Sequence, residues 1–142
     1  MKKIYLLDTN IVSEFSKERP NEQVVGLYNL RRDQCAISSV TWQELVFGFS
    51  RMPEGRKKDY IRSCLDLYKR DLEIIPYDEF AASICGEVQS NAEQAGKKIP
   101  YNDSQIAATA ISNGMVLVTH NTEDFSYMTE KTFLKMEDWF AA

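Results

Sequence analysis

The sequence predicts an α/β fold built on a mostly parallel sheet of about five strands. Short apolar segments of strand length alternate with longer segments in which apolar residues recur at helical spacing. Such alternation is typical of a parallel sheet covered by helices on both faces. The chain has 142 residues, the usual size of one domain, so we expect a single domain over residues 1–142.

The first half of the chain supplies two predicted strands and four predicted helices. Residues 3–7 form a short apolar run that stops at Asp8, as a buried parallel strand would, and residues 35–38 form a second strand. Helices are predicted at residues 9–15, 21–30, 41–50 and 53–70. The last of these carries apolar side chains at helical spacing, namely Tyr60, Ile61, Cys64, Leu65 and Tyr68.

The second half continues the alternation. Residues 72–76 read as a strand, and residues 79–95 as a helix that stops at Gly96. A helix rich in small residues follows at 103–112. The clearest buried strand covers residues 115–119, and a last edge strand is predicted at 133–136.

Composition excludes several classes of protein. The net charge is 17 − 21 = −4, so charge alone gives no indication of a nucleic-acid binder. An odd number of cysteines without a C-x-x-C motif argues against a disulfide framework and a thiolate zinc site, and we expect reduced core cysteines. The N-terminal apolar run is too short for a signal peptide, and no run is long enough to span a membrane. We therefore expect a cytoplasmic protein without a membrane partner.

Four carboxylates occupy positions that suggest convergence. Asp8 directly follows the first strand, and Asp124 lies in the loop after the strand at 115–119. Glu44 and Asp103 lie near the starts of helices. Ligands in open α/β sheets bind outside the carboxyl ends of the strands, so we expect the four side chains to meet there.

Each acid also has a purely structural interpretation. Asp8 could cap the helix that follows it, and Thr41 with Glu44 has the form of a capping box. Asp103 could favour a helix N-terminus behind Asn102 as the cap, and Asp124 could be a solvated loop residue.

Convergence of the acids would require a cation. Two carboxylates 4 Å apart repel by ~1 kcal/mol in water and by ~4 kcal/mol at an effective dielectric of 20. A donor set made only of oxygen suits Mg²⁺ or Mn²⁺, which can support attack of water on a phosphodiester. His120 is interpreted as a solvated loop residue. The chain lacks the phosphate-binding loops of nucleotide enzymes and the G-x-S-x-G elbow of hydrolases.

Four stretches, at residues 6–10, 37–48, 102–108 and 117–125, resemble the signature segments of PIN-domain proteins, above all the VapC-like toxins of bacterial toxin–antitoxin systems. The resemblance implies a three-layer α/β/α sandwich and an Mg²⁺- or Mn²⁺-dependent endoribonuclease. Asp8, Glu44 and Asp103 match the metal-holding acids of the family. Many PIN proteins place a fourth acid where this chain has Asn121, and Asp124 follows three residues later, so either residue could complete the site.

The resemblance also implies partners: an RNA substrate, a VapB-like antitoxin that inhibits by direct binding, and a second copy in a homodimer. The basic run from Arg51 to Lys58 is expected to contact phosphates beside the site without being needed for folding. Trp42, Phe47 and Phe49 lie on more than one face of one helix, which predicts a mixture of core and partner groove.

Three alternatives remain. Haloacid-dehalogenase-like phosphatases also begin with a strand that ends in aspartate, but they need an acid where this chain has Asn10. Signalling receiver domains need a lysine after a late strand, and residues 119–121 offer none. A PIN-like binding module without catalysis would not need the intact acids.

Overall fold

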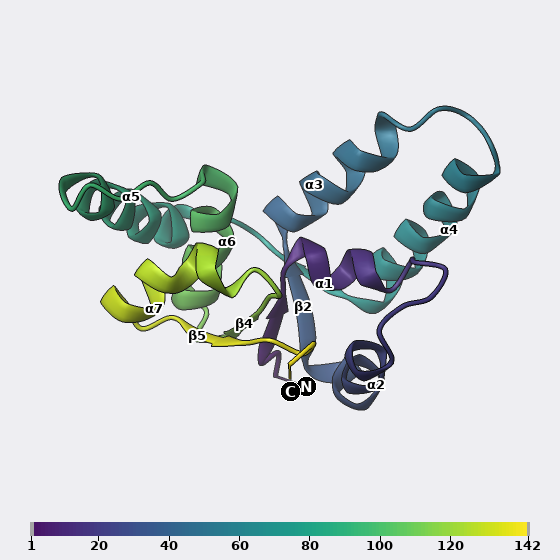
Figure 1. Ribbon diagram of the computed structural model, residues 1–142, viewed down its shortest axis with the longest axis horizontal. Helices are drawn as coiled ribbons and strands as arrows, with labels where there is room; N and C mark the ends of the chain where they lie inside the picture. Colours follow the sequence, from purple (N-terminus) through teal and green to yellow (C-terminus); the bar gives the residue numbers. More distant parts are fainter. Residues whose placement is uncertain (1, 142) are drawn as a thin grey trace.

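A computed structural model describes residues 2–141 and shows a five-stranded, fully parallel sheet in the order β3-β2-β1-β4-β5 (Figure 1). The strands are β1 (Tyr5–Leu7), β2 (Cys35–Ser38), β3 (Glu73–Ile75), β4 (Val116–Val118) and β5 (Lys135–Glu137). β1 lies at the centre of the sheet, and its Leu7 pairs with Val118 of β4. The predicted α/β class and parallel sheet are therefore confirmed.

Seven α-helices are found in the described part of the chain, together with short 3₁₀ turns at Arg32–Gln34 and Thr122–Phe125 (η2). The helices are α1 (Thr9–Glu14), α2 (Glu22–Arg31), α3 (Ser39–Ser50), α4 (Arg56–Asp71), α5 (Glu79–Gln94), α6 (Tyr101–Ser112) and α7 (Ser126–Lys131). Figure 1 shows α3 and α4 as an arm on one side of the sheet and α5, α6 and α7 on the other side.

The core is divided into two main apolar layers. One contains Leu6, Ile106 and Leu117, and the other contains Leu7, Val12 and Val118. Neighbouring residues of β1 and β4 thus point to opposite faces, as the alternation of side chains along a strand requires. The sheet is buried on both faces, which explains the unbroken apolar runs in its strands.

Several predicted boundaries are wrong. α3 begins two residues earlier than expected, because Ser38 caps it: the Ser38 hydroxyl accepts a hydrogen bond from the Thr41 amide at 3.0 Å. α6 begins at Tyr101, with Pro100 as its N-cap, so Asn102 is not the cap. α4 begins at Arg56, and α7 was not predicted at all.

Other expectations are confirmed. Gly96 ends α5 in a left-handed conformation with φ 74°, and the amides of Gly96 and Lys97 bond back to the carbonyls of Glu93 and Ala92, which is a Schellman motif. Cys35, Cys64 and Cys85 are buried free thiols. Within residues 2–141, the helices are all too short or too polar to cross a bilayer.

Candidate functional site

The four predicted acids all lie at the carboxyl edge of the sheet. Asp8 follows β1, and its amide donates to the carbonyl of Val118 in β4 at 2.8 Å. Glu44 lies on α3, which follows β2 directly, and Asp103 lies in the first turn of α6. Asp124 lies in η2, after β4. All strands run in the same direction, so their ends and the following helices bring these residues to one side of the sheet.

Asp8 is buried, with only 4% of its surface exposed. One carboxylate oxygen accepts a hydrogen bond from the Thr9 amide at 2.8 Å, which confirms that Asp8 caps α1. The other accepts from the Thr119 hydroxyl at 2.8 Å and the Asn10 amide at 3.0 Å. Burial raises the pKa of Asp8, and the charge of Glu44 raises it further, while these three hydrogen bonds oppose the shift.

Glu44 reaches toward the site instead of capping its own helix. Its Oε1 accepts a hydrogen bond from the Thr9 hydroxyl at 2.6 Å, and its Oε2 accepts one from the Asn102 amide at 3.3 Å. The predicted capping box of Thr41 and Glu44 is therefore wrong, because Ser38 performs the capping. The Glu44 carboxylate therefore links α1 to α6 by accepting hydrogen bonds from Thr9 and Asn102.

Asp103 responds to the charges of the other three acids. Its pKa is raised to about 6, first by burial and then by the negative charges of Asp8, Asp124 and Glu44, in that order. These causes indicate that the charges of Asp8, Asp124 and Glu44 act on Asp103.

Asp124 and Asn121 are the two predicted candidates for the fourth position of the site. Asp124 is exposed on η2, and its charge contributes to the raised pKa of Asp103. Asn121 is also exposed, and its backbone amide donates to the Thr119 hydroxyl at 3.1 Å. Of these two residues, Asp124 supplies the charge that Asp103 feels.

Sequence reasoning missed the polar side chains that hold the acids. Thr119 lies directly after β4 and is fully buried, and its hydroxyl receives a hydrogen bond from Asn10 at 3.2 Å while it donates to Asp8. Thr9 and Asn102 hold Glu44 in the same way. The available signal was positional: Asn10 and Thr119 adjoin the ends of two strands predicted to lie in one parallel sheet.

His120 is exposed, as expected, but it is held in place. Its backbone amide donates to Asn10 Oδ1 at 3.0 Å, its Nδ1 lies 3.2 Å from an Asp138 carboxylate oxygen, and its ring packs 4.1 Å from the Phe140 ring. The imidazole therefore faces the C-terminal segment and is not a freely rotating loop side chain.

The donor chemistry of the cluster fits a hard divalent cation. All four acids offer oxygen, and their mutual repulsion, seen at Asp103, is the effect that a cation would relieve. Across residues 2–141, however, three or more His, Cys, Asp or Glu side chains are nowhere already arranged as a ligand set. The Asp8 and Glu44 oxygens are instead occupied by hydrogen bonds from Thr9, Asn10, Thr119 and Asn102.

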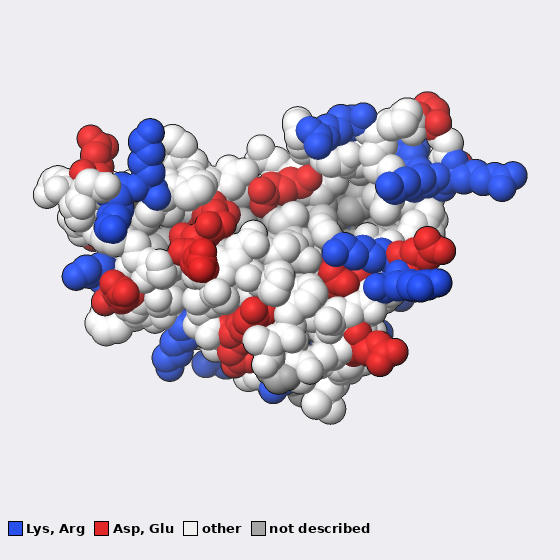
Figure 2. Space-filling model, in the orientation of Figure 1, with Lys and Arg blue, Asp and Glu red and all other residues white. Residues whose placement is uncertain are grey.

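A groove of about 460 Å³ opens beside the acids, between α1, α3 and α4. Thr9 and Glu44 line its inner end, and Arg51 and Lys57 line it farther along. Figure 2 shows acidic side chains near the middle of this face and basic side chains toward both of its ends, including the end formed by the tips of α3 and α4.

The predicted basic run divides into two parts. Arg51, Arg56 and Lys57 are exposed. Lys58 is buried, lies 3.2 Å from Glu54 and has its ammonium 5.1 Å from the centre of the Phe49 ring. The predicted basic surface from Arg51 to Lys58 is therefore corrected at Lys58, which is buried because α4 packs against Phe49.

The aromatic residues of α3 differ in their surroundings, and the partner groove among them stays a prediction. Trp42 packs partly buried against the core, and Phe49 lines the groove. Phe47 has 62% of its surface exposed, with the Arg51 guanidinium 5.2 Å from its ring centre.

Comparison with known proteins gives consistent matches over nearly the whole chain. The PIN domain family matches residues 5–131. Toxin FitB of Neisseria gonorrhoeae is 36% identical over 124 residues, which cover 84% of this chain and 89% of that toxin. The tRNA(fMet)-specific endonuclease VapC of Shigella flexneri is 31% identical over 137 residues, or 95% and 97% of the two chains. A crystal structure of VapBC2 from Rickettsia felis, bound to a DNA fragment from its promoter, superimposes with a TM-score of 0.82 at 33% identity, covering 96% of this chain and 98% of that one.

Proposed function

This chain belongs to the PIN-domain family, among the VapC-like toxins, and on that premise we propose that it is a divalent-metal-dependent endoribonuclease held inactive by an antitoxin. One observation carries the proposal: Thr9 joins two of the acids, with its amide 2.8 Å from Asp8 and its hydroxyl 2.6 Å from Glu44, and Asn102, the neighbour of Asp103, donates to Glu44 at 3.3 Å. The raised pKa of Asp103 agrees with this arrangement. Within residues 2–141, the side chains that donate to Asp8 and Glu44 are neutral, so these acids with Asp103 and Asp124 form a site suited to a metal ion.

In the proposed mechanism Asp8, Glu44 and Asp103 hold Mg²⁺ or Mn²⁺, and Asp124 assists from η2. A bound ion of this kind supplies positive charge for the phosphate oxygens and lowers the pKa of water. Thr119, Asn10 and Thr9 orient Asp8 and Glu44 by hydrogen bonds of 2.6–3.0 Å. This support holds the acidic oxygens in place while RNA binds and the products leave.

The direct test is cleavage by the purified chain. We expect hydrolysis of RNA in the presence of Mg²⁺ or Mn²⁺, loss of cleavage when the metal is chelated, and recovery when it is returned. A PIN-like module that only binds RNA would bind the same RNA without cutting it. Absence of metal-dependent cleavage under conditions where the protein is folded would therefore contradict the proposed function.

We propose that the groove between α1, α3 and α4 receives the antitoxin. The groove has apolar walls that include Leu45, Ile61 and Leu65, which suits the apolar face of an amphipathic helix. Its inner end opens at Glu44, so a basic side chain from the partner could neutralise the acids there. The structurally similar VapBC and FitAB complexes are the basis for expecting such a partner.

Arg51, Arg56 and Lys57 are proposed to contact RNA phosphates in the free toxin. We expect charge reversal at Arg56 and Lys57 to weaken RNA binding while the melting temperature stays the same; Lys58 is left unchanged in this test because it is buried. Unchanged RNA affinity would remove this surface from the proposal. The toxin is further proposed to act in the cytoplasm as a homodimer.

A further inference from the structure

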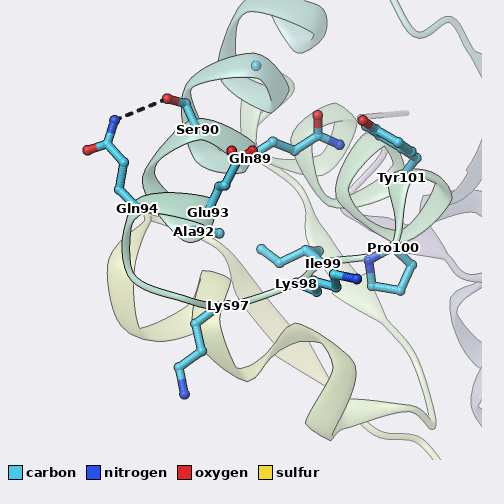
Figure 3. A pocket seen from close by; sticks show the side chains of 11 residues that line it. Gln89, Ser90, Ala92, Glu93, Gln94, Lys97, Lys98, Ile99, Pro100 and Tyr101 are labelled. Carbon is cyan, nitrogen blue, oxygen red and sulfur yellow. Dashed lines mark hydrogen bonds between the residues drawn. The ribbon is translucent and has the colours of Figure 1, made fainter.

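We infer that the cavity between α5 and the start of α6 binds an unpaired nucleotide of the RNA substrate, with its base stacked on Tyr101. This inference rests on the proposed ribonuclease function. It says where the RNA substrate binds beyond the acidic site. The cavity has a volume of about 980 Å³, and its lining includes Gln89, Lys98, Pro100 and Tyr101 (Figure 3).

Tyr101 is a large aromatic side chain with 73% of its surface exposed, although it lies in the first turn of a helix. In Figure 3 it stands at one edge of the cavity, on the same side as Gln89. An exposed aromatic ring beside a cavity is a stacking platform, since every nucleobase offers a flat face. A base inside a duplex already stacks on its neighbours, so this platform selects unpaired RNA.

The surroundings of Tyr101 have the charge that a strand of RNA requires. Lys97 and Lys98 both line the cavity, against one acid, Glu93. Figure 3 shows Lys98 running alongside Ile99 and Pro100, while Lys97 projects outward. The Schellman motif at Gly96 fixes the start of this loop, so the lysines are held near the cavity.

The cavity and the acids are linked by the first turn of α6, which carries Tyr101, Asn102 and Asp103. Asn102, the next residue after Tyr101, donates to Glu44, and Asp103 follows it. Figure 2 shows acidic side chains in the middle of this face and basic side chains, with further acidic ones beside them, at both of its ends. A strand that contacts Arg51 and Lys57 at one end and Lys98 at the other would therefore pass the acids with its phosphates.

The test measures binding separately from cleavage. Affinity for a short, unstructured, fluorescently labelled oligoribonucleotide is measured by anisotropy in EDTA, for wild type, Tyr101→Ala, Tyr101→Trp and Phe133→Ala. We expect Tyr101→Ala to weaken binding about tenfold and Tyr101→Trp to retain it, because loss of one stacked base is a change of this size. Phe133, whose side chain is 94% exposed on another loop, is the matched control and should have no effect.

Two further measurements decide the interpretation. Binding of the same sequence as a duplex should be insensitive to Tyr101→Ala. Sedimentation should give the same oligomeric state for wild type and Tyr101→Ala; a change in that state would show that Tyr101 is a contact between copies and would overturn the inference. Equal affinity of wild type and Tyr101→Ala for the single strand, or no binding by wild type, would also overturn it. Failure of the nuclease proposal is recognised separately, as tight, Tyr101-dependent binding without metal-dependent cleavage.

Discussion

The two ends of α1 carry two carboxylates that expose equally little surface but have pKa values shifted in opposite directions. Asp8 caps the start of the helix and Glu14 is its last residue, and each has 4% of its surface exposed. Glu14 is paired with the Lys17 ammonium at 2.8 Å and accepts a hydrogen bond from the Asn21 amide at 2.8 Å. Asp8 receives hydrogen bonds from neutral groups only, and a second acid, Glu44, lies near it.

The pKa values follow this difference. The hydrogen bond from Lys17 lowers the pKa of Glu14, whereas burial raises the pKa of Asp8. A buried charge with a cationic partner stabilises the loop after α1, while an uncompensated one opposes folding. Two carboxylates with equally little exposed surface therefore differ in whether a cationic side chain compensates their charge, and Asp8 is the one without such a partner among residues 2–141.

The largest expected difference between the two ends is in activity. Asp8→Asn keeps the size of the side chain and the cap of α1, but it removes the charge that would hold a metal ion. We expect cleavage of RNA to fall by more than about a hundredfold. The matched variant Glu14→Gln should cleave at nearly the wild-type rate, since Glu14 lies at the far end of the helix. Comparable activity in Asp8→Asn and wild type would remove Asp8 from the mechanism.

The second expected difference is the response to metal. Added Mg²⁺ should raise the melting temperature of wild type, because an ion that binds only the native state stabilises it by mass action. At a hundredfold excess over the dissociation constant the gain is ~2.7 kcal/mol, or about 8 °C for a chain of this size. Glu14→Gln should show the same gain, and Asp8→Asn little or none. If the melting temperature of wild type is the same with and without Mg²⁺, the acids do not bind the metal.

The convergence of the acids was predictable because it depends on topology. Asp8 adjoins the end of a strand, Asp124 lies in the loop after another, and all strands of the sheet run in one direction. The predictions of helix caps that are wrong depend on single local contacts. The hydroxyl of Ser38, interpreted as part of a strand, caps α3, and this releases Glu44 from the capping box that its spacing suggested.

Burial of individual side chains was harder to predict than the sheet. Lys58 looks solvent-exposed in a basic run, and only the packing of α4 against Phe49 turns it inward. α7 was missed because Met128 is its one buried side chain, so its sequence shows no apolar stripe at helical spacing. The expected edge strand at 133–136 lies slightly too early, since Phe133 is apolar in sequence but 94% exposed in the fold, and β5 begins at Lys135.

A smaller effect on the stability of the protein is expected at Glu14, whose charge is compensated by Lys17. Glu14→Gln should lower the free energy of unfolding by about 1 kcal/mol near neutral pH, because it weakens a charge-assisted hydrogen bond. The pKa of Glu14 is lowered from 4.5 in the folded chain, so its contribution is complete above pH 4.5 and is lost as the pH falls through the folded value. Denaturant titrations should therefore show wild type and variant converging below pH 4.5. A constant difference at all pH values would assign the effect to packing instead.

The stability at the Asp8 end of α1 should depend on pH with the opposite sign. The pKa of Asp103 rises from 3.8 to about 6 on folding, so between these values the folded, metal-free chain binds more protons than the unfolded chain. The stability of the metal-free protein must then fall as the pH rises from 3.8 to about 6, and level off above that. Asp103→Asn should flatten part of this fall but not all of it, because the pKa of Asp8 is raised in the same direction. Melting temperatures measured in EDTA across this range test the point, with Asp66→Asn, an exposed carboxylate on α4, as the matched control. If Asp103→Asn and Asp66→Asn give the same profile as wild type, the carboxylates at the sheet edge do not repel one another, and the contrast with Glu14 loses its electrostatic basis.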